Sequence, residues 1–116
     1  MSRMPINNYE RYHAHIYFDE DTSEIAKQLC TVIDQHFDLA IGRFHERPVG
    51  PHPLWSCQVS FNSKDFGQFI PWLDENRQNL TVFVHALTGD DLSDHTDHAY
   101  WLGEAVELKL AIFKKN

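Results

Sequence analysis

Histidine gives this sequence most of its potential chemistry. Eight of the 116 residues are histidine. A neutral imidazole binds Zn, Fe, Cu or Ni through one ring nitrogen, and its usual pKa near 6.5 also suits proton transfer. His13 and His15 are separated by one residue. In a β-strand this spacing places both rings on the same side, about 6–7 Å apart along the chain. A third imidazole from a neighbouring strand would complete a metal site.

The element that must position this pair is a strand predicted over residues 11–18. Its aromatic and β-branched residues alternate between two faces. One face carries Tyr12, Ala14, Ile16 and Phe18, and the other carries His13, His15 and Tyr17. If the apolar face meets the core, the histidines lie on the opposite face of the sheet.

The rest of the chain predicts two helices and further strands. Amphipathic helices are indicated over residues 23–36 and 64–77. Strands are predicted over 37–45, 54–61, 80–87 and 105–113, with a loop over 46–53 and a turn or short helix over 92–103. The order βαββαβ is typical of an α+β ferredoxin-like fold, an antiparallel sheet with two helices on one face. Residues 105–113 would add an extra C-terminal strand. We expect a single domain over 1–116, with a flexible N-terminus over 1–9.

This topology brings a third histidine to the pair. His85 alternates with apolar residues in the strand 80–87, so it faces the same way as His13 and His15. The first and fourth strands of the fold are antiparallel neighbours, which places the start of one beside the end of the other. His95 follows the fourth strand at that end, and His52 lies in a loop that could fold over the face. The face is otherwise open, which favours a homodimer that buries it.

Each histidine taken singly also has a simpler interpretation. An HxH pair on a strand can serve packing or hydrogen bonding, and a lone buried histidine usually has a polar partner in the core. His36, His45 and His98 are expected to be incidental. The metal site is favoured because three separate elements place imidazoles on one face.

Composition restricts the partners and the compartment. The formal net charge of −7 argues against nucleic acid as a partner. No apolar run approaches the roughly 18–20 residues of a membrane span, and the N-terminus lacks the apolar stretch of a secretory signal. Cys30 and Cys57 lack metal-binding spacing, and Cys57 is predicted to face the core. We therefore expect a cytoplasmic protein with reduced thiols and no membrane partner.

Other chemistry-bearing residues are few. Arg43 and Arg47 could bind a carboxylate in bidentate fashion, although surface charge is the alternative. Tyr17 and Trp101 could stack on an aromatic substrate, although core packing is the alternative. No Gly-rich phosphate loop and no G-x-S-x-G motif occurs in the sequence.

Four segments together resemble the DOPA 4,5-dioxygenase family. They are YHAHIYFD (12–19), VGPHPLWSCQVSF (49–61), VFVHALTGDDLSDHT (82–96) and AYWLG (99–103). The resemblance runs from about residue 10 to about residue 110. It implies an extradiol dioxygenase on a ferredoxin-like scaffold, which uses non-haem Fe(II) and O₂ to open a catechol ring beside its two hydroxyls. The histidines in the matching segments are His13, His15, His52, His85 and His95.

The face alignment and the family motifs together give a hypothesis for the site. We expect His13, His15 and His85 to bind the metal, with Zn or another divalent ion as the alternative to Fe(II). We expect His52 and His95 to act in acid–base or substrate roles, and Tyr17, Arg47 and Trp101 to bind the substrate. The commoner facial set has two histidines and one carboxylate, for which Glu46, Asp94 and Glu104 are candidates. An all-histidine triad is an equal alternative.

Two further functions remain open from the sequence. One is a non-catalytic dimeric α+β module that binds a small ligand or a structural metal. The other is a metal-dependent enzyme of another reaction type, because a shared fold does not fix the chemistry.

Overall fold

The computed structural model describes residues 5–113. The elements along the chain are β1 (Arg11–Phe18), α1 (Ser23–His36), β2 (Ala40–His45), β3 (Trp55–Asn62), α2 (Ser63–Asn76), β4 (Val82–Ala86), α3 (Asp91–Asp94) and β5 (Ala99–Leu102). A short 3-10 helix, Leu110–Phe113, follows β5.

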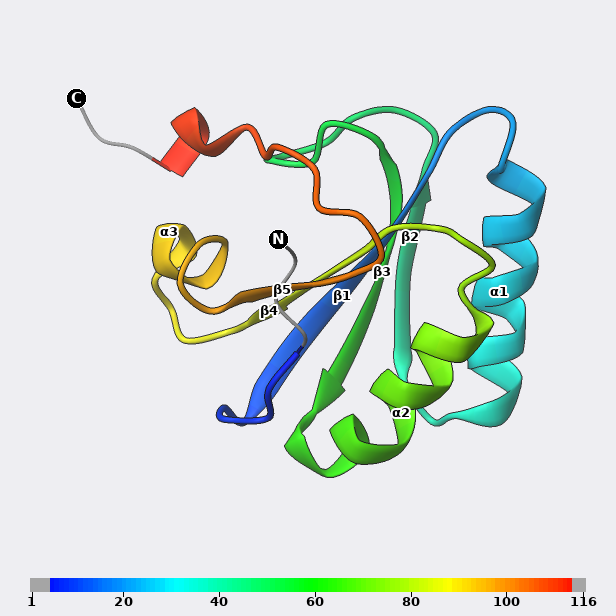
Figure 1. Cartoon of the computed structure of the whole chain (residues 1–116), viewed down its shortest axis with the longest axis horizontal. Helices are drawn as coiled ribbons and strands as arrows, with labels where there is room; N and C mark the ends of the chain where they lie inside the picture. The colour runs from blue at the N-terminus through cyan, green and yellow to red at the C-terminus, as the bar shows by residue number, and fades with distance from the viewer. Residues whose placement is uncertain (1–4, 114–116) are drawn as a thin grey trace.

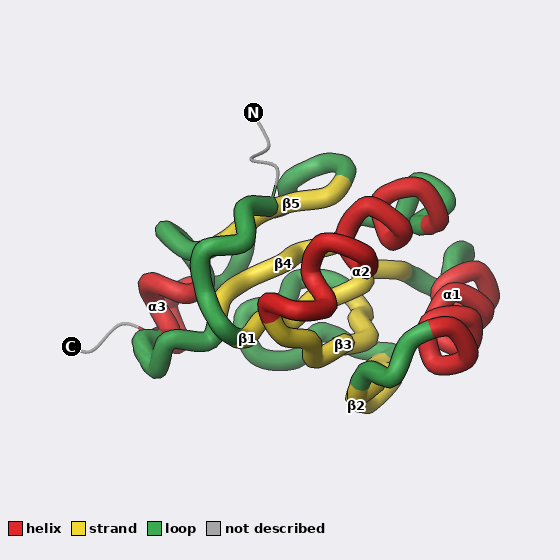
Figure 2. The backbone as a smooth tube through the Cα atoms, turned by 90° about the horizontal axis from the view of Figure 1, so that it is seen from below, coloured by secondary structure: helices red, strands yellow, loops and turns green. Residues whose placement is uncertain are grey.

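The strands form one antiparallel sheet in the order β2-β3-β1-β4-β5. Its first four strands have the predicted ferredoxin-like order, and α1 and α2 lie together on one side of the sheet (Figures 1 and 2). The α+β fold is therefore confirmed. β1 is central, with β3 on one side and β4 on the other. This arrangement brings side chains from β1 and β4 next to one another.

The main hydrophobic core lies between the sheet and the two long helices. The buried residues of the two helices are Ala26, Leu29, Cys30 and Ile33 of α1 and Phe66, Phe69, Ile70 and Leu73 of α2. They pack against the apolar face of β1 and against Cys57 of β3. Because side chains alternate along a strand, His13, His15 and Tyr17 face the opposite side.

Local hydrogen bonds fix where α2 begins. The Asn62 side chain accepts hydrogen bonds from the backbone nitrogens of Lys64 and Asp65 at 2.9 and 3.2 Å. The Asp65 carboxylate in turn accepts one from the Asn62 nitrogen, which completes a capping box. The helix therefore starts directly after β3, at Ser63, one residue before the predicted start at residue 64.

Two strands differ from the prediction. The extra C-terminal strand is β5, within the segment predicted as a turn or short helix, and the predicted strand over 105–113 is wrong. β5 pairs with the free edge of β4, so residues 105–113 have no edge there to join. Their alternation has another cause, since Val106 and Leu108 pack against the buried pair Tyr17 and Phe83. In addition, the second strand begins at Ala40 and not at residue 37.

The histidine face of the sheet is covered, so the expectation of an open face is wrong. The loop 46–54 and the segment 104–113 lie over it, and the Lys109 nitrogen donates a hydrogen bond to the Pro51 carbonyl oxygen at 2.8 Å. Figure 1 shows the end of the chain, coloured orange to red, on the side of the sheet away from α1 and α2. Tyr17 and Phe83 are only 1% and 0% exposed. The physical argument for a homodimer is thereby removed, and the homodimer itself stays a prediction.

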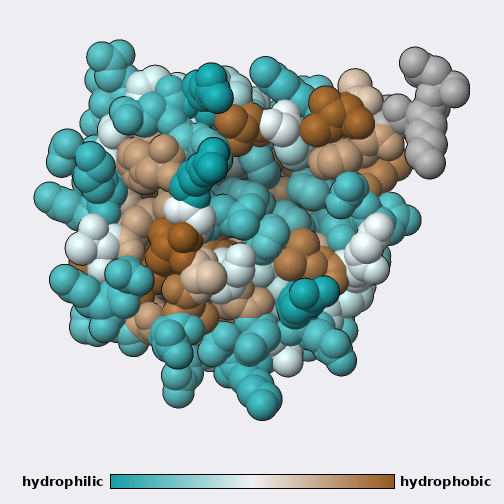
Figure 3. Space-filling model, turned by 180° about the vertical axis from the view of Figure 1, so that it is seen from behind, coloured by the Kyte–Doolittle hydropathy of each residue, from teal (hydrophilic) through white to brown (hydrophobic). Residues whose placement is uncertain are grey.

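On the face of the molecule seen from behind, hydrophilic residues predominate and the hydrophobic residues form separate patches (Figure 3). Within residues 5–113, no helix has the length and apolar character needed to cross a bilayer. Residues 1–4 of the predicted flexible N-terminus lie outside the described residues. Residues 5–9 form no helix or strand, and the Asn7 side chain donates a hydrogen bond to the Ser63 carbonyl oxygen at 3.0 Å.

Candidate metal centre

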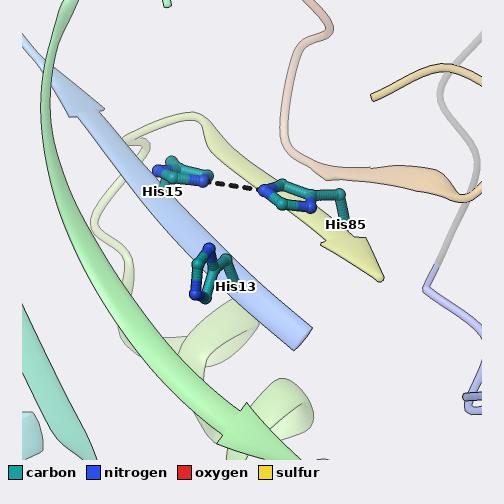
Figure 4. A group of neighbouring side chains, drawn as sticks. All are labelled: His13, His15 and His85. Atoms are coloured by element: carbon teal, nitrogen blue, oxygen red, sulfur yellow. Dashed lines mark hydrogen bonds between the residues drawn. The ribbon is translucent and has the colours of Figure 1, made fainter. Parts of the chain in front are cut away.

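Strand register brings three histidines together on β1 and β4. His13 lies directly opposite His85 in the antiparallel pair, and His15 follows two residues later on the same face. The three rings converge on one another (Figure 4), and one nitrogen of each lies within 4.8 Å of the others. The placement predicted from the alternation and the topology is therefore confirmed.

His15 and His85 face each other through their Nε2 atoms, which are 3.0 Å apart. The His85 ring is held by its Nδ1–H, which donates to the Ala86 carbonyl oxygen at 2.8 Å. This leaves the lone pair of His85 Nε2 free. Two adjacent imidazole ligands, each about 2.0–2.1 Å from a metal, are about 3 Å apart. The separation therefore suits two nitrogens that share one ion, and it also suits a hydrogen bond with one proton between the rings.

Burial keeps these imidazoles neutral. His15 and His85 are 4% and 2% exposed. Burial is the main reason that the pKa of His85 falls to about 3, against the opposing effect of its hydrogen bond to Ala86. Burial and the neighbouring imidazoles also hold the pKa of His15 well below its usual 6.5, and the pKa of the half-buried His13 is lowered chiefly by burial. Neutral imidazole is the form that binds a metal, so the centre is ready to bind at neutral pH.

His52 reaches the same centre from the loop 46–54. Its ring centroid lies 4.0 Å from that of His15, and its Nδ1 lies 2.6 Å from the hydroxyl of Tyr17. Burial, and then His95, lower the pKa of His52 to about 4. Burial raises the pKa of Tyr17. Both partners of this hydrogen bond are therefore neutral near pH 7.

His95 approaches from the other side, just after α3. Its ring centroid lies 4.2 Å from that of His85 and 4.6 Å from that of Phe113. Its Nδ1–H donates to the Asp91 carbonyl oxygen at 2.7 Å, which leaves Nε2 free. Together with His13, His15, His52 and His85, it forms what we call the five-histidine group.

Comparison with known proteins places this arrangement in a family. The sequence model of the Dopa 4,5-dioxygenase family matches residues 12–112, which include the whole five-histidine group. The chain belongs to the Dopa 4,5-dioxygenase family. This finding confirms the resemblance carried by the four sequence segments.

Two relatives and one solved structure are also similar to this chain. An uncharacterized 21.2 kDa protein of Botryotinia fuckeliana is 37% identical over 116 residues, covering 90% of this chain and 63% of that protein. A DOPA 4,5-dioxygenase of Amanita muscaria is 29% identical over 111 residues, covering 88% of this chain and 49% of that protein. The chain thus spans 49–63% of the length of these two relatives. A crystal structure from Nostoc punctiforme, named a "putative dioxygenase", has a TM-score of 0.85 and 37% identity, covering 88% of this chain and 89% of that one.

Two cavities adjoin the five-histidine group of this family member. The larger, of about 480 Å³, is lined by His95, by Trp101 of β5 and by residues of the segment 106–111. The smaller, of about 220 Å³, is lined on its polar side by His15, His45, His52, Ser56 and Gln58. Trp101 therefore lies where a ligand beside the histidines could reach it. Arg47 is exposed on the loop 46–54 and lines neither cavity.

The smaller cavity contains residues that the sequence did not single out. His45, expected to be incidental, pairs across the sheet with Ser56 and lines this cavity. Because side chains alternate along β3, Ser56 and Gln58 lie on the face opposite Cys57, but this alternation does not give the register of β2. His36 is exposed at the end of α1, and His98 packs against Tyr9 with ring centroids 4.8 Å apart, outside the five-histidine group.

No carboxylate joins the three converging histidines within residues 5–113. Glu46 and Glu104 are exposed. Asp94 is buried, but its two oxygens accept hydrogen bonds from the backbone nitrogen and the hydroxyl of Thr88 at 2.8 and 2.6 Å. The donor set assembled by the fold therefore consists of histidine alone.

Proposed function

We propose that this protein is a non-haem Fe(II)-dependent extradiol dioxygenase that opens the ring of DOPA or a related catechol with O₂. Family membership supports an oxygenase. The observation that carries the metal-dependent chemistry is the convergence of His13, His15 and His85 within 4.8 Å. The metal, the position of ring cleavage and the substrate are the parts that experiment must establish.

In this proposal His13, His15 and His85 hold the metal. Imidazole is a suitable ligand for Fe(II), and a set of three protein ligands leaves positions for small molecules. Bound Fe(II) would supply the one-electron chemistry that allows O₂ to react with a catechol. Zn or another divalent ion fits the same three nitrogens, so the experiment below compares protein loaded with different metals.

His52 is the proposed acid–base group, with Tyr17 as its partner. When His52 Nδ1 carries the proton and donates to the Tyr17 oxygen, Nε2 can accept a proton from a catechol hydroxyl. When the Tyr17 hydroxyl donates to Nδ1, Nε2–H can return a proton. A tyrosine hydroxyl both donates and accepts, so the contact at 2.6 Å supports both tasks.

His95 is proposed to act beside the substrate. Its Nδ1 is engaged by the Asp91 carbonyl, so its free Nε2 is the atom available to a catechol oxygen or a proton. Trp101, in the cavity next to His95, would contact the aromatic ring or its side chain. Tyr17 is buried and acts through His52 in this scheme, while Arg47 is retained for a substrate carboxylate.

The decisive experiment is anaerobic reconstitution of the purified chain with Fe(II), followed by L-DOPA and air-saturated buffer. We expect O₂ uptake and a yellow semialdehyde product, whose mass and absorption identify the bond cleaved. Protein loaded with Zn(II) is the matched control, because it fills the same ligands without redox chemistry. Absence of O₂ uptake with L-DOPA and a panel of other catechols would contradict the proposal.

The same samples test the alternative of a non-catalytic module. Stoichiometric Zn(II) that resists chelation, combined with an inactive Fe(II) form, would favour a structural metal. Rapid removal of the metal by a chelator, with activity restored on adding Fe(II), would favour the enzyme.

A further inference from the structure

Cys30 and Cys57 form a second group with reactive potential, on the opposite side of the sheet from the histidines. Both are free, and they are 8% and 1% exposed. Cys30 belongs to the inward stripe of α1, and Cys57 to the inward face of β3. The proposed dioxygenase chemistry uses neither of them.

The two thiols belong to the same core cluster and line the same cavity, Cys30 from α1 and Cys57 from β3. A hydrogen bond between the two thiols is the main cause of their opposite pKa shifts. This bond lowers the pKa of the Cys57 thiol and, together with burial, raises that of Cys30. Cys57 is therefore the thiol that loses its proton more readily, and the thiolate is the nucleophilic form.

A cavity of about 420 Å³ reaches both cysteines. Lys27, Thr31 and Asp34 line it from α1, and Ile41, Gly42 and Phe44 line it from β2. The pairing of β2 with β3 shifts register between Ile41 and Phe44, so this stretch of β2 is irregular beside Cys57. The Lys27 ammonium nitrogen, at this cavity, lies 5.8 Å from the centroid of the Phe44 ring. A small polar oxidant thus has both a path to the thiols and an activated nucleophile.

We propose that Cys30 and Cys57 are a peroxide-sensitive dithiol that closes to a reversible intramolecular disulfide. The Cys57 thiolate attacks one oxygen of hydrogen peroxide, breaking the O–O bond, and becomes a sulfenic acid as hydroxide leaves and takes up a proton to form water. The Cys30 thiol then attacks the Cys57 sulfur, the S–S bond forms, and a second water leaves. Two thiols lose two electrons, and one peroxide gains them.

Closure requires the two sulfurs to approach each other to about 2 Å, the length of a disulfide bond. A cross-link of this kind ties α1 to β3, the strand that also carries Ser56 and Gln58 beside His15 and His52. The reaction itself needs no metal and does not depend on the proposed function.

The test uses the full chain, reduced, metal-free and treated with hydrogen peroxide. We expect the intact mass to fall by about 2 Da, the loss of two hydrogens, with both thiols becoming unreactive and dithiothreitol restoring them. Peptide mapping should recover a Cys30–Cys57 cross-linked peptide. Oxidation that stops at sulfinic acid, cross-links only between molecules, or leaves two titratable thiols would overturn the proposal.

Serine variants assign the roles of the two thiols. Cys30→Ser should accumulate a sulfenic acid on Cys57 that a dimedone probe traps, and Cys57→Ser should react with peroxide at least about tenfold more slowly. A trivalent arsenical gives a second measurement on the unmodified chain, because it bridges only thiols that lie close together. A one-to-one adduct supports the proposal, and its absence contradicts the proximity on which the proposal rests.

Discussion

At the residue scale, the metal-binding capacity depends on which nitrogen of each imidazole is left free. Backbone carbonyls engage Nδ1 of His85 and of His95, which leaves Nε2 of each ring free, and Nε2 of His85 faces His15. Carbonyls of this kind orient metal ligands in many proteins and fix their tautomer. The centre is therefore organised by main-chain atoms of β4 and α3 as much as by the histidines themselves.

The first prediction concerns the three converging histidines. Replacing His13, His15 or His85 with alanine should lower the iron content of reconstituted protein and reduce activity by more than about 100-fold, the upper end of what losing an outer-shell partner costs. His13 is the most informative site because it is half-exposed and leaves the smallest buried void. His36→Ala, at the exposed end of α1, is the matched control and should bind iron normally. Full iron content and activity in all three variants would remove these residues from the proposed site.

The second prediction isolates the hydrogen bond between Tyr17 and His52. Tyr17→Phe should lower kcat by roughly tenfold, well under the about 10²–10⁴-fold contributed by a complete acid–base group, with iron content unchanged. The pH profile of kcat should also shift. Tyr12→Phe removes a hydroxyl that bonds to Asn7 on the other face of β1, so it serves as the control. An unchanged pH profile in Tyr17→Phe would argue that Tyr17 is only a packing residue.

At the scale of elements, β1 and β4 each contribute both to the main core and to the histidine face. One face of each strand fills the main core, and the other carries buried imidazoles that form no ion pair with a carboxylate among the described residues. Buried neutral histidines are tolerated at neutral pH. In acid they oppose folding, because these histidines bind protons in the unfolded chain and remain neutral in the folded chain. The structure should therefore be sensitive to acid in a pH range set by histidine.

The third prediction gives the sign and range of this effect. The pKa of His85 falls from 6.5 to about 3 and that of His52 to about 4 on folding. As pH drops below 6.5, the unfolded state binds more protons and the metal-free protein loses stability, by up to about 1.4 kcal/mol per pH unit for each such histidine. Urea unfolding at pH 7, 6 and 5 measures this slope. It should flatten in His85→Gln, and a free energy of unfolding that is constant from pH 7 to 5 would refute the prediction.

At the scale of the whole molecule, two remote segments close the histidine face. The loop 46–54 brings His52, the segment 104–113 lies beside His95 and Trp101, and a backbone hydrogen bond from Lys109 to Pro51 joins them. Because His15, His52 and His85 are each no more than 5% exposed, a substrate must displace part of this cover to reach them.

The fourth prediction tests this cover. Lys109→Pro removes the nitrogen–hydrogen donor and with it a hydrogen bond worth about 1 kcal/mol, or about fivefold in an opening equilibrium. The bound metal should be lost to a chelator several-fold faster than in the unmodified protein. Lys109→Ala keeps the backbone donor and is the control. Equal rates of metal loss in the two variants would show that this hydrogen bond does not hold the cover in place.

Much of the framework could be predicted because its signals are local. The stripes of α1 and α2 and the alternation of β1 and β4 each follow from side-chain period within one element. The ferredoxin-like order of the first four strands followed from the sequence of elements, and it placed the pair His13 and His15 near His85. The errors fall where pairing depends on distant partners. β5 is too short to show a clear alternation in the sequence. The alternation of residues 105–113 reflects the packing of Val106 and Leu108 against Tyr17 and Phe83, and these residues form no strand.

The sequence by itself determined which residue types are present, which face of each strand they occupy and which family they resemble. Only the tertiary structure decided that His52 meets Tyr17, that His45 borders the centre, that no carboxylate joins the three histidines within residues 5–113, and that the face is closed. The physical reason is that the side-chain periodicity within a helix or strand fixes only the face on which each side chain lies. The meeting of side chains from a loop, a distant strand and the end of the chain depends on how the whole molecule packs.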